Sequence, residues 1–310
     1  NFAVGCLKSA KFGTQGYGLF AVEEVEDFTD LTLSVVIPAY NEEGGIRETI
    51  QEVQTALDQL PIPTEIIVVD DGSKDNTRAE AQAAGARIEA NPVNSGYGAA
   101  LKRGIRAAKY EFVAILDADR TYPARYLGGM LQLAREYDMV VGDRGAAMEN
   151  VPLVRRPAKK MLNWLASFLA KRKLNDINSG LRVFRRAELL PFLPLLPSGF
   201  SFTTTITLCM ACSEKPLVYT PIEYRRRVGR SKIKPIDFIN FIVLMLRVIM
   251  LFNPLRIFLP AGLVFFLIGS AKLAYDVTQL NLSETAVFMY LASIMVWSLG
   301  LIADMISRLH

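Results

Sequence analysis

Two long uncharged segments near the C-terminus limit what this chain can fold into more than any other feature. Residues 257–271 and 285–303 contain no charged side chain, and both are apolar on every side of a helix. A surface helix of a soluble domain keeps a polar face, whereas a helix that spans a membrane needs about 20 mostly apolar residues. We therefore expect residues 254–310 to form two transmembrane helices joined by a short loop at 276–284. The alternative is a pair of core helices in a soluble protein.

The segment before these helices is expected to lie on the membrane surface. Residues 236–252 are mostly apolar, with Asp237 and Arg247 as their only charged residues, and Pro254 ends the pattern. They follow a basic stretch, residues 224–234, that would bind anionic lipid or close over a substrate. Basic residues favour the cytoplasmic side of a membrane, and the loop at 276–284 has none. We expect a juxtamembrane helix within 233–253, with the N-terminal part and the C-terminus in the cytoplasm.

The composition excludes several classes of catalytic and binding site. The single histidine is His310, the last residue, which removes serine–histidine triads, histidine bases and histidine metal sites. Three cysteines are too few for a disulfide framework or a four-cysteine zinc site. The net charge of +4 is too small to indicate nucleic acid, so none is expected as a partner. Residues 1–30 show no signal-peptide pattern and receive no predicted role.

Between residues 31 and 232, apolar runs typical of buried strands alternate with helical patterns. The expected strands are 33–39, 65–69, 112–116 and 139–141, and the expected helices are 42–60, 77–84 and 99–110. Asn41 is placed to cap the first of these helices. Such alternation predicts an α/β fold, with a mostly parallel sheet flanked by helices on both faces. In such sheets ligands bind beyond the carboxyl ends of the strands.

Polar residues follow three of the predicted strands at these carboxyl ends. The clusters are Pro38–Glu42, Asp70–Ser73 and Asp117-Ala118-Asp119. A lone Asp-x-Asp is common in solvated loops and helix caps, but this one ends a buried strand, where two uncompensated carboxylates are costly. Side chains at i and i+2 share a face, and two carboxylates that close together need a cation. Oxygen ligands without histidine favour Mg²⁺ or Mn²⁺, bridging to a diphosphate.

Two common nucleotide fingerprints are missing. No Gly-x-Gly-x-x-Gly follows the first strand, and no Gly-x-x-x-x-Gly-Lys-Ser/Thr occurs in the chain, which argues against a dinucleotide dehydrogenase and a P-loop NTPase. Gly96-Tyr97-Gly98 opens a predicted helix, but its spacing fits neither fingerprint. We interpret this motif as a site of tight packing or a turn.

Taken together, these clusters resemble the family 2 glycosyltransferases of the GT-A fold. The chain is most similar to their polyprenyl-phosphate branch, which includes dolichol-phosphate mannose synthase and the undecaprenyl-phosphate glucosyltransferases. The resemblance covers about residues 33–232, plus a two-helix membrane tail found in some members. It implies a GT-A (Rossmann-like) domain at 31–232, followed by the juxtamembrane helix and the membrane anchor.

The resemblance also implies roles for the matching residues. The nucleotide-binding residues would be Pro38, Tyr40, Glu42, Asp71 and Asp117. The metal on the donor diphosphate would be held by Asp117, Asp119 and Thr121, although many members have a glutamine at the third position. The residues that match phosphate- or acceptor-binding motifs are Arg144, Ser179, Arg182 and Lys232. Asp143 departs from the serine that usually precedes this arginine.

The implied reaction is attack of a lipid phosphate oxygen on the anomeric carbon of a nucleotide sugar, with inversion. A phosphate monoester loses its second proton near about pH 6, so this nucleophile needs no histidine base. Arginines must hold the acceptor phosphate, because two anions otherwise repel. The candidates are Arg155, Arg156, Lys159, Arg182 and Arg227, with Asp176 as an auxiliary group. We expect Asp119, Arg182 and Lys232 to be the catalytic residues.

Two other functions stay open at this point. A processive polysaccharide synthase of the same superfamily would share the Asp-x-Asp but carry Gln-x-x-Arg-Trp, which this chain lacks. A catalytically silent subunit that binds nucleotide sugar is the other alternative. The donor is not specified by the sequence, since GDP-mannose and UDP-glucose both fit. The expected acceptor is a dolichyl or undecaprenyl phosphate, and the apolar tail would permit a homo-oligomer.

Overall fold

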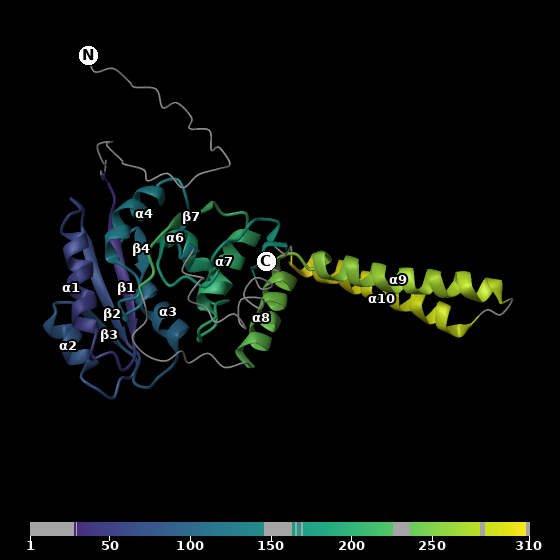
Figure 1. Cartoon of the computed structure of the whole chain (residues 1–310), viewed down its shortest axis with the longest axis horizontal. Helices are drawn as coiled ribbons and strands as arrows, with labels where there is room; N and C mark the ends of the chain where they lie inside the picture. Colours follow the sequence, from purple (N-terminus) through teal and green to yellow (C-terminus); the bar gives the residue numbers. More distant parts are fainter. Residues whose placement is uncertain are drawn as a thin grey trace, which may run out of the picture.

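A computed structural model describes residue 28 and residues 30–145, 163–164, 166–168, 170–225, 236–279 and 283–307. The N-terminal half alternates strands with helices, as predicted (Figure 1). Its strands are β1 Leu33–Ala39, β2 Thr64–Asp70, β3 Arg87–Ala90 and β4 Phe112–Ile115. Its helices are α1 Ile46–Leu57, α2 Thr77–Ala83, α3 Tyr97–Ala107, η1 Ala124–Tyr126 and α4 Leu127–Leu133.

The described strands form one sheet of seven strands in the order β3-β2-β1-β4-β6-β5-β7. The remaining strands are β5 Met139–Asp143, β6 Arg182–Arg185 and β7 Leu217–Pro221. All run in one direction except β6, which is antiparallel to β4 and β5. The mostly parallel sheet is therefore confirmed. The reversed strand was not predicted, because its short sequence has an arginine at each end and no long apolar run.

Helices cover both faces of this sheet, and each face has its own hydrophobic core. In β1, Val35 and Ile37 face a core shared with α1 and α4, whereas Val36 faces a core shared with α3 and α7. Strands buried on both faces read as continuous apolar runs, which explains why the pattern predicted them well. The remaining helices of this domain are α6 Arg186–Leu189, η4 Leu190–Phe192 and α7 Phe202–Cys212.

The expected cap of α1 is wrong. The helix begins at Ile46 after Gly45, and Asn41 adopts a left-handed backbone with φ of 55°. Its side-chain oxygen accepts a hydrogen bond from the Lys74 backbone N–H at 2.9 Å. Asn41 therefore joins the loops that follow β1 and β2 instead of capping a helix.

The C-terminal part forms a helical hairpin that projects away from the sheet domain (Figure 1). α9 Leu255–Thr278 and α10 Glu284–Ser307 have 24 residues each, which corresponds to about 36 Å. Only 11% and 17% of their most apolar windows are buried, so they are not core helices of the domain. Both are long and apolar enough to cross a membrane.

α8, Ile236–Phe252, lies along the edge of the domain, and one of its ends meets the base of the hairpin in Figure 1. Val248 and Ile249 are buried in the core beside α7, whereas Val243, Leu246 and Met250 are exposed. The helix expected at 236–252 is thus present. It binds the domain through one face and leaves apolar side chains on another.

Candidate active site

The polar clusters that follow β1, β2 and β4 meet at one edge of the sheet. β1 and β2 are parallel and in register, with Ala39 opposite Asp70. The loops beyond them are joined where the Glu42 backbone N–H donates to the Thr77 hydroxyl at 2.8 Å. The Thr49 hydroxyl of α1 donates to the Ala118 carbonyl at 2.9 Å, which ties the β4 cluster to the same edge. The predicted convergence is therefore present.

Asp117 is half-buried, and its carboxylate is held by a tyrosine. The Tyr97 hydroxyl, at the start of α3, donates to Asp117 Oδ1 at 2.8 Å. Burial and the charge of Asp117 raise the pKa of Tyr97 well above its usual value, so the hydroxyl keeps its proton. The backbone of Gly180 lies against the other oxygen, since a Cβ added there would be 2.4 Å from Asp117 Oδ2. Two segments thus limit the rotation of this carboxylate.

Asp119 is oriented by its own loop. Arg120 has a φ of 61°, and the chain turns back so that the Thr121 hydroxyl and backbone N–H donate to Asp119 Oδ1 at 2.6 and 3.2 Å. Thr121 is buried, with only 1% of its surface exposed. Thr121 therefore positions Asp119, and its predicted role as a metal ligand stays a prediction.

Asp71, expected on the base or ribose, is buried and organises the loop after β3. Its carboxylate accepts hydrogen bonds from Asn91 Nδ2 at 2.7 Å, the Ser95 N–H at 2.9 Å and the Gly96 N–H at 2.8 Å. Its neighbour Asp70 is also buried and pairs with Arg78 at 2.8 Å. Both acids therefore help to fix the loops at this edge of the sheet.

The other predicted nucleotide-binding residues lie at the end of β1 and just after it. Pro38 is buried and sits opposite Val69 of β2. Tyr40 and Glu42 are half-buried in the loop that follows the strand. Their position beside Asp71 is compatible with the predicted role, which stays a prediction.

Arg144 follows β5 and forms an ion pair that sequence reasoning missed. Its Nε and Nη2 donate to the two carboxylate oxygens of Asp176 at 2.6 and 2.8 Å, and its guanidinium lies over the Tyr224 ring at 5.2 Å. Burial opposes the charge, but the hydrogen bonds and charge of Asp176, together with Tyr122 and Tyr224, outweigh it, so the pKa of Arg144 is raised. The two residues are 32 positions apart, and no local pattern signals the pair.

The predicted acceptor segment at 178–182 contains one buried cation and one buried hydroxyl. Arg182 has no exposed surface, and its guanidinium donates to the carbonyls of Ser179 and Ile177 at 2.9 and 2.8 Å. Ser179 Oγ is buried without a hydrogen-bond partner among the described residues. Arg182 therefore binds the backbone of this turn, whereas the Ser179 hydroxyl makes no hydrogen bond to the described residues.

The predicted basic residues Arg155, Arg156, Lys159, Arg227 and Lys232 lie outside the described residues. The start of the basic stretch is described and is attached to the Asp-x-Asp loop. The Arg225 N–H donates to the Thr121 carbonyl at 2.9 Å, and its guanidinium binds Glu52 at 2.7 and 3.0 Å. The described start of the basic stretch is therefore tied to the Asp-x-Asp loop and to α1.

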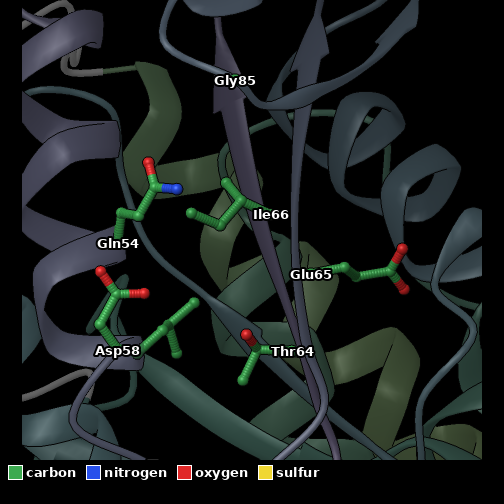
Figure 2. Close-up of a pocket in the computed structure, with 7 residues that line it drawn as sticks. Gln54, Asp58, Thr64, Glu65, Ile66 and Gly85 are labelled. Carbon is green, nitrogen blue, oxygen red and sulfur yellow. The ribbon is translucent and has the colours of Figure 1, made fainter.

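A separate surface pocket lies at the opposite, N-terminal edge of β2 (Figure 2). Gln54 and Asp58 of the α1 region face Thr64 and Ile66, while Glu65 points to the other side of the strand. Glu65 is already engaged by the Ser34 hydroxyl at 2.7 Å. This pocket contains none of the predicted site residues.

Comparison with known proteins finds a matching family for each of the two parts of the chain. Residues 34–189 match the family Glycosyl transferase family 2, and residues 253–309 match the GtrB C-terminal hairpin. A dolichyl-phosphate hexose transferase of Haloferax volcanii is 34% identical over 67% of this chain and 90% of its own length. An undecaprenyl-phosphate 4-deoxy-4-formamido-L-arabinose transferase of Sodalis glossinidius is 27% identical over 90% of this chain and 89% of its own length.

Among solved structures, glucosyl-3-phosphoglycerate synthase from Mycobacterium tuberculosis shares the fold. Its complex with Mn²⁺, UDP-glucose and phosphoglyceric acid has a TM-score of 0.55 and 24% identity, covering 72% of this chain and 81% of that chain. The same enzyme was also solved with Mg²⁺ and UDP.

Proposed function

Because this chain belongs to glycosyl transferase family 2, we propose that it transfers a hexose from a nucleotide sugar to a polyprenyl phosphate. The relatives named for dolichyl-phosphate and undecaprenyl-phosphate transfer support this acceptor class. The observation that carries the proposal is the edge of the sheet where Asp117 and Asp119 are held in place beside the loops after β1 and β2. GDP-mannose and UDP-glucose are the donors proposed for testing.

The oxygen atoms available as metal ligands at this edge fit Mg²⁺ or Mn²⁺. Asp117 and Asp119 offer carboxylate oxygens, which these ions prefer. Within the described residues, no group of three or more His, Cys, Asp or Glu side chains could hold a metal by itself. Two carboxylates therefore suit an ion whose other ligands come from a diphosphate. Such an ion would neutralise charge on the departing nucleoside diphosphate.

The chain's own residues must position two phosphate-bearing substrates. An oxygen of the acceptor phosphate forms a bond to the anomeric carbon while the bond to the donor diphosphate breaks, so the configuration inverts. Above about pH 6 the nucleophile carries its own charge, and no general base is required. Ser179 Oγ and the cations Arg155, Arg156, Arg227 and Lys232 are proposed acceptor contacts. Arg144 is proposed to contribute charge while Asp176 fixes its direction.

The membrane arrangement completes the proposal. Residues 254–310 form the anchor, the 233–253 segment lies at the interface, and the 31–232 domain faces the cytoplasm. Exposed apolar side chains on α8 support contact with lipid, as does the basic stretch before it. This arrangement would place the edge of the sheet that carries Asp117 and Asp119 within reach of a lipid phosphate.

Transfer of radiolabelled sugar to a short polyprenyl phosphate tests the proposed function. The chain in detergent should transfer one sugar per lipid with Mg²⁺ or Mn²⁺, and EDTA should abolish transfer. Asp119→Ala should lower kcat/KM by about 100-fold or more, because transition-state charge stabilisation is lost. Asp58→Ala is the matched control, since Asp58 is exposed at the opposite edge (Figure 2).

The same assay separates the alternatives. Products with several sugars on one lipid would indicate a processive synthase. Binding of nucleotide sugar without any transfer would indicate a silent subunit. Unchanged metal-dependent transfer by Asp119→Ala would refute the proposed site.

A further inference from the structure

The segment at 95–98 connects two carboxylates of the candidate active site. At one end, the Ser95 and Gly96 N–H groups donate to Asp71. At the other end, the Tyr97 hydroxyl donates to Asp117. The Gly96-Tyr97-Gly98 motif matched no nucleotide fingerprint, so its residue types need an explanation from the structure.

The two glycines allow a distant loop to close on the start of α3. Gly96 has a φ of 100°, and a Cβ there would be 2.5 Å from the Ser198 carbonyl oxygen. A Cβ on Gly98 would be 2.2 Å from the Pro197 carbonyl oxygen. The Ala99 N–H donates to the Ser198 carbonyl at 3.1 Å, which holds the two segments together. The predicted role of the motif was tight packing or a turn, and these contacts agree with tight packing.

Tyr97 lies between these glycines and is fixed on two sides. Its ring stacks on Phe200, with ring centroids 5.7 Å apart and an interplanar angle of 15°. Its hydroxyl points at Asp117 Oδ1. On the far side of the carboxylate, Gly180 is anchored because its N–H donates to the Tyr122 hydroxyl at 2.7 Å. The Asp117 carboxylate is therefore clamped between Tyr97 and the acceptor turn.

We propose that Tyr97 is a positioning residue that sets the orientation of Asp117 for a divalent cation bound with a nucleoside diphosphate. The inference rests on the proposed function, and it adds a residue that acts through Asp117 without touching the reacting atoms. Partners that orient a metal ligand commonly change metal affinity by about 10- to 100-fold when they are removed. Tyr97→Phe removes only the hydroxyl and retains the ring that stacks on Phe200.

Binding of Mn²⁺, measured by electron paramagnetic resonance as loss of the free-ion signal, tests the inference without relying on activity. The full chain in detergent is titrated with Mn²⁺ alone, with UDP and with GDP. Tyr97→Phe should weaken Mn²⁺ binding in the presence of the effective nucleotide by about 10-fold or more. Tyr110→Phe is the matched control, because Tyr110 lies at the opposite end of β4, and it should bind as wild type does.

A second variant keeps the test independent of any folding defect in the first. Phe200→Leu removes the stacked ring at a position that is 62% exposed, so the fold should tolerate it. It retains the hydroxyl of Tyr97 and should weaken Mn²⁺ binding to a smaller extent than Tyr97→Phe does. Thermal unfolding of each variant identifies any loss of fold.

The outcomes separate this inference from the proposed function. Wild-type protein that binds no Mn²⁺ with either nucleotide would overturn the proposed metal site and the inference with it. If Tyr97→Phe and Phe200→Leu both bind Mn²⁺ as strongly as wild type does, the role of Tyr97 is overturned while the proposed metal site stands. Weaker binding by Tyr97→Phe, with Tyr110→Phe at the wild-type level, supports it.

Discussion

Arg182 shows how burial changes the interpretation of a charged residue. The resemblance placed it on the acceptor phosphate, yet it has no exposed surface. Its guanidinium also donates to the Thr207 hydroxyl at 2.6 Å, in addition to the two carbonyls of the 177–179 turn. Burial lowers the pKa of Arg182, and these acceptors compensate for lost hydration. Its geometry therefore favours support of the acceptor turn over contact with substrate.

Arg182→Ala is expected to lower the free energy of unfolding by about 3–5 kcal/mol. The substitution leaves a cavity and buried carbonyls without donors. Urea denaturation of the full chain in detergent, followed by circular dichroism, measures the change. Arg47→Ala removes a half-buried surface ion pair with Glu80 and should unfold close to wild type. Equal denaturation midpoints for wild type and Arg182→Ala would contradict a supporting role.

At the scale of elements, the close approach of the loop at 197–199 decides where α3 begins. The apolar pattern predicted a helix at 99–110, but α3 spans Tyr97–Ala107. The helix starts earlier because the loop at 197–199 accepts one of its first backbone N–H groups. That loop is about 100 positions away in the chain, so a local pattern contains no sign of it.

Two glycine substitutions test this packing. Gly98→Ala should lower the free energy of unfolding by about 1–3 kcal/mol, because its Cβ would overlap the Pro197 carbonyl. Gly129→Ala is the control in α4, where an added Cβ meets no atom within 4 Å. It should raise stability by up to about 1 kcal/mol, because alanine loses less backbone entropy in a helix. Equal changes in the free energy of unfolding for the two variants would show that the loop at 197–199 does not pack tightly against α3.

At the scale of the whole molecule, the hairpin and the domain meet through α8. The sheet domain places the Asp-x-Asp edge, α8 attaches to the domain by Val248 and Ile249, and the hairpin extends from it (Figure 1). Gly262 and Gly300 let α9 and α10 approach, since added Cβ atoms would meet Trp297 and Phe258. Small residues at such contacts are typical of helices packed in membranes.

The proposed orientation predicts which side of the membrane each part faces. In a chain whose native cysteines are replaced, Gln279→Cys in the hairpin loop should react with an impermeant maleimide added to intact cells. Asp58→Cys on the sheet domain should react only after lysis. The reason is that basic residues before α8 favour the cytoplasmic side. The reverse labelling pattern would invert the proposed topology.

The sequence alone determined the features that depend on local pattern. It predicted β1, the helix at 236–252, the two long apolar helices and the meeting of the three polar clusters. Buried strands and lipid-facing helices have continuous apolar runs, and parallel strands end at one edge, so each conclusion needs only neighbouring residues. Only the tertiary structure decided which side chains pair across that edge. Tyr97 with Asp117, Arg144 with Asp176 and the burial of Arg182 join segments that lie apart in the chain, and the charge or hydroxyl of a residue does not reveal its partner.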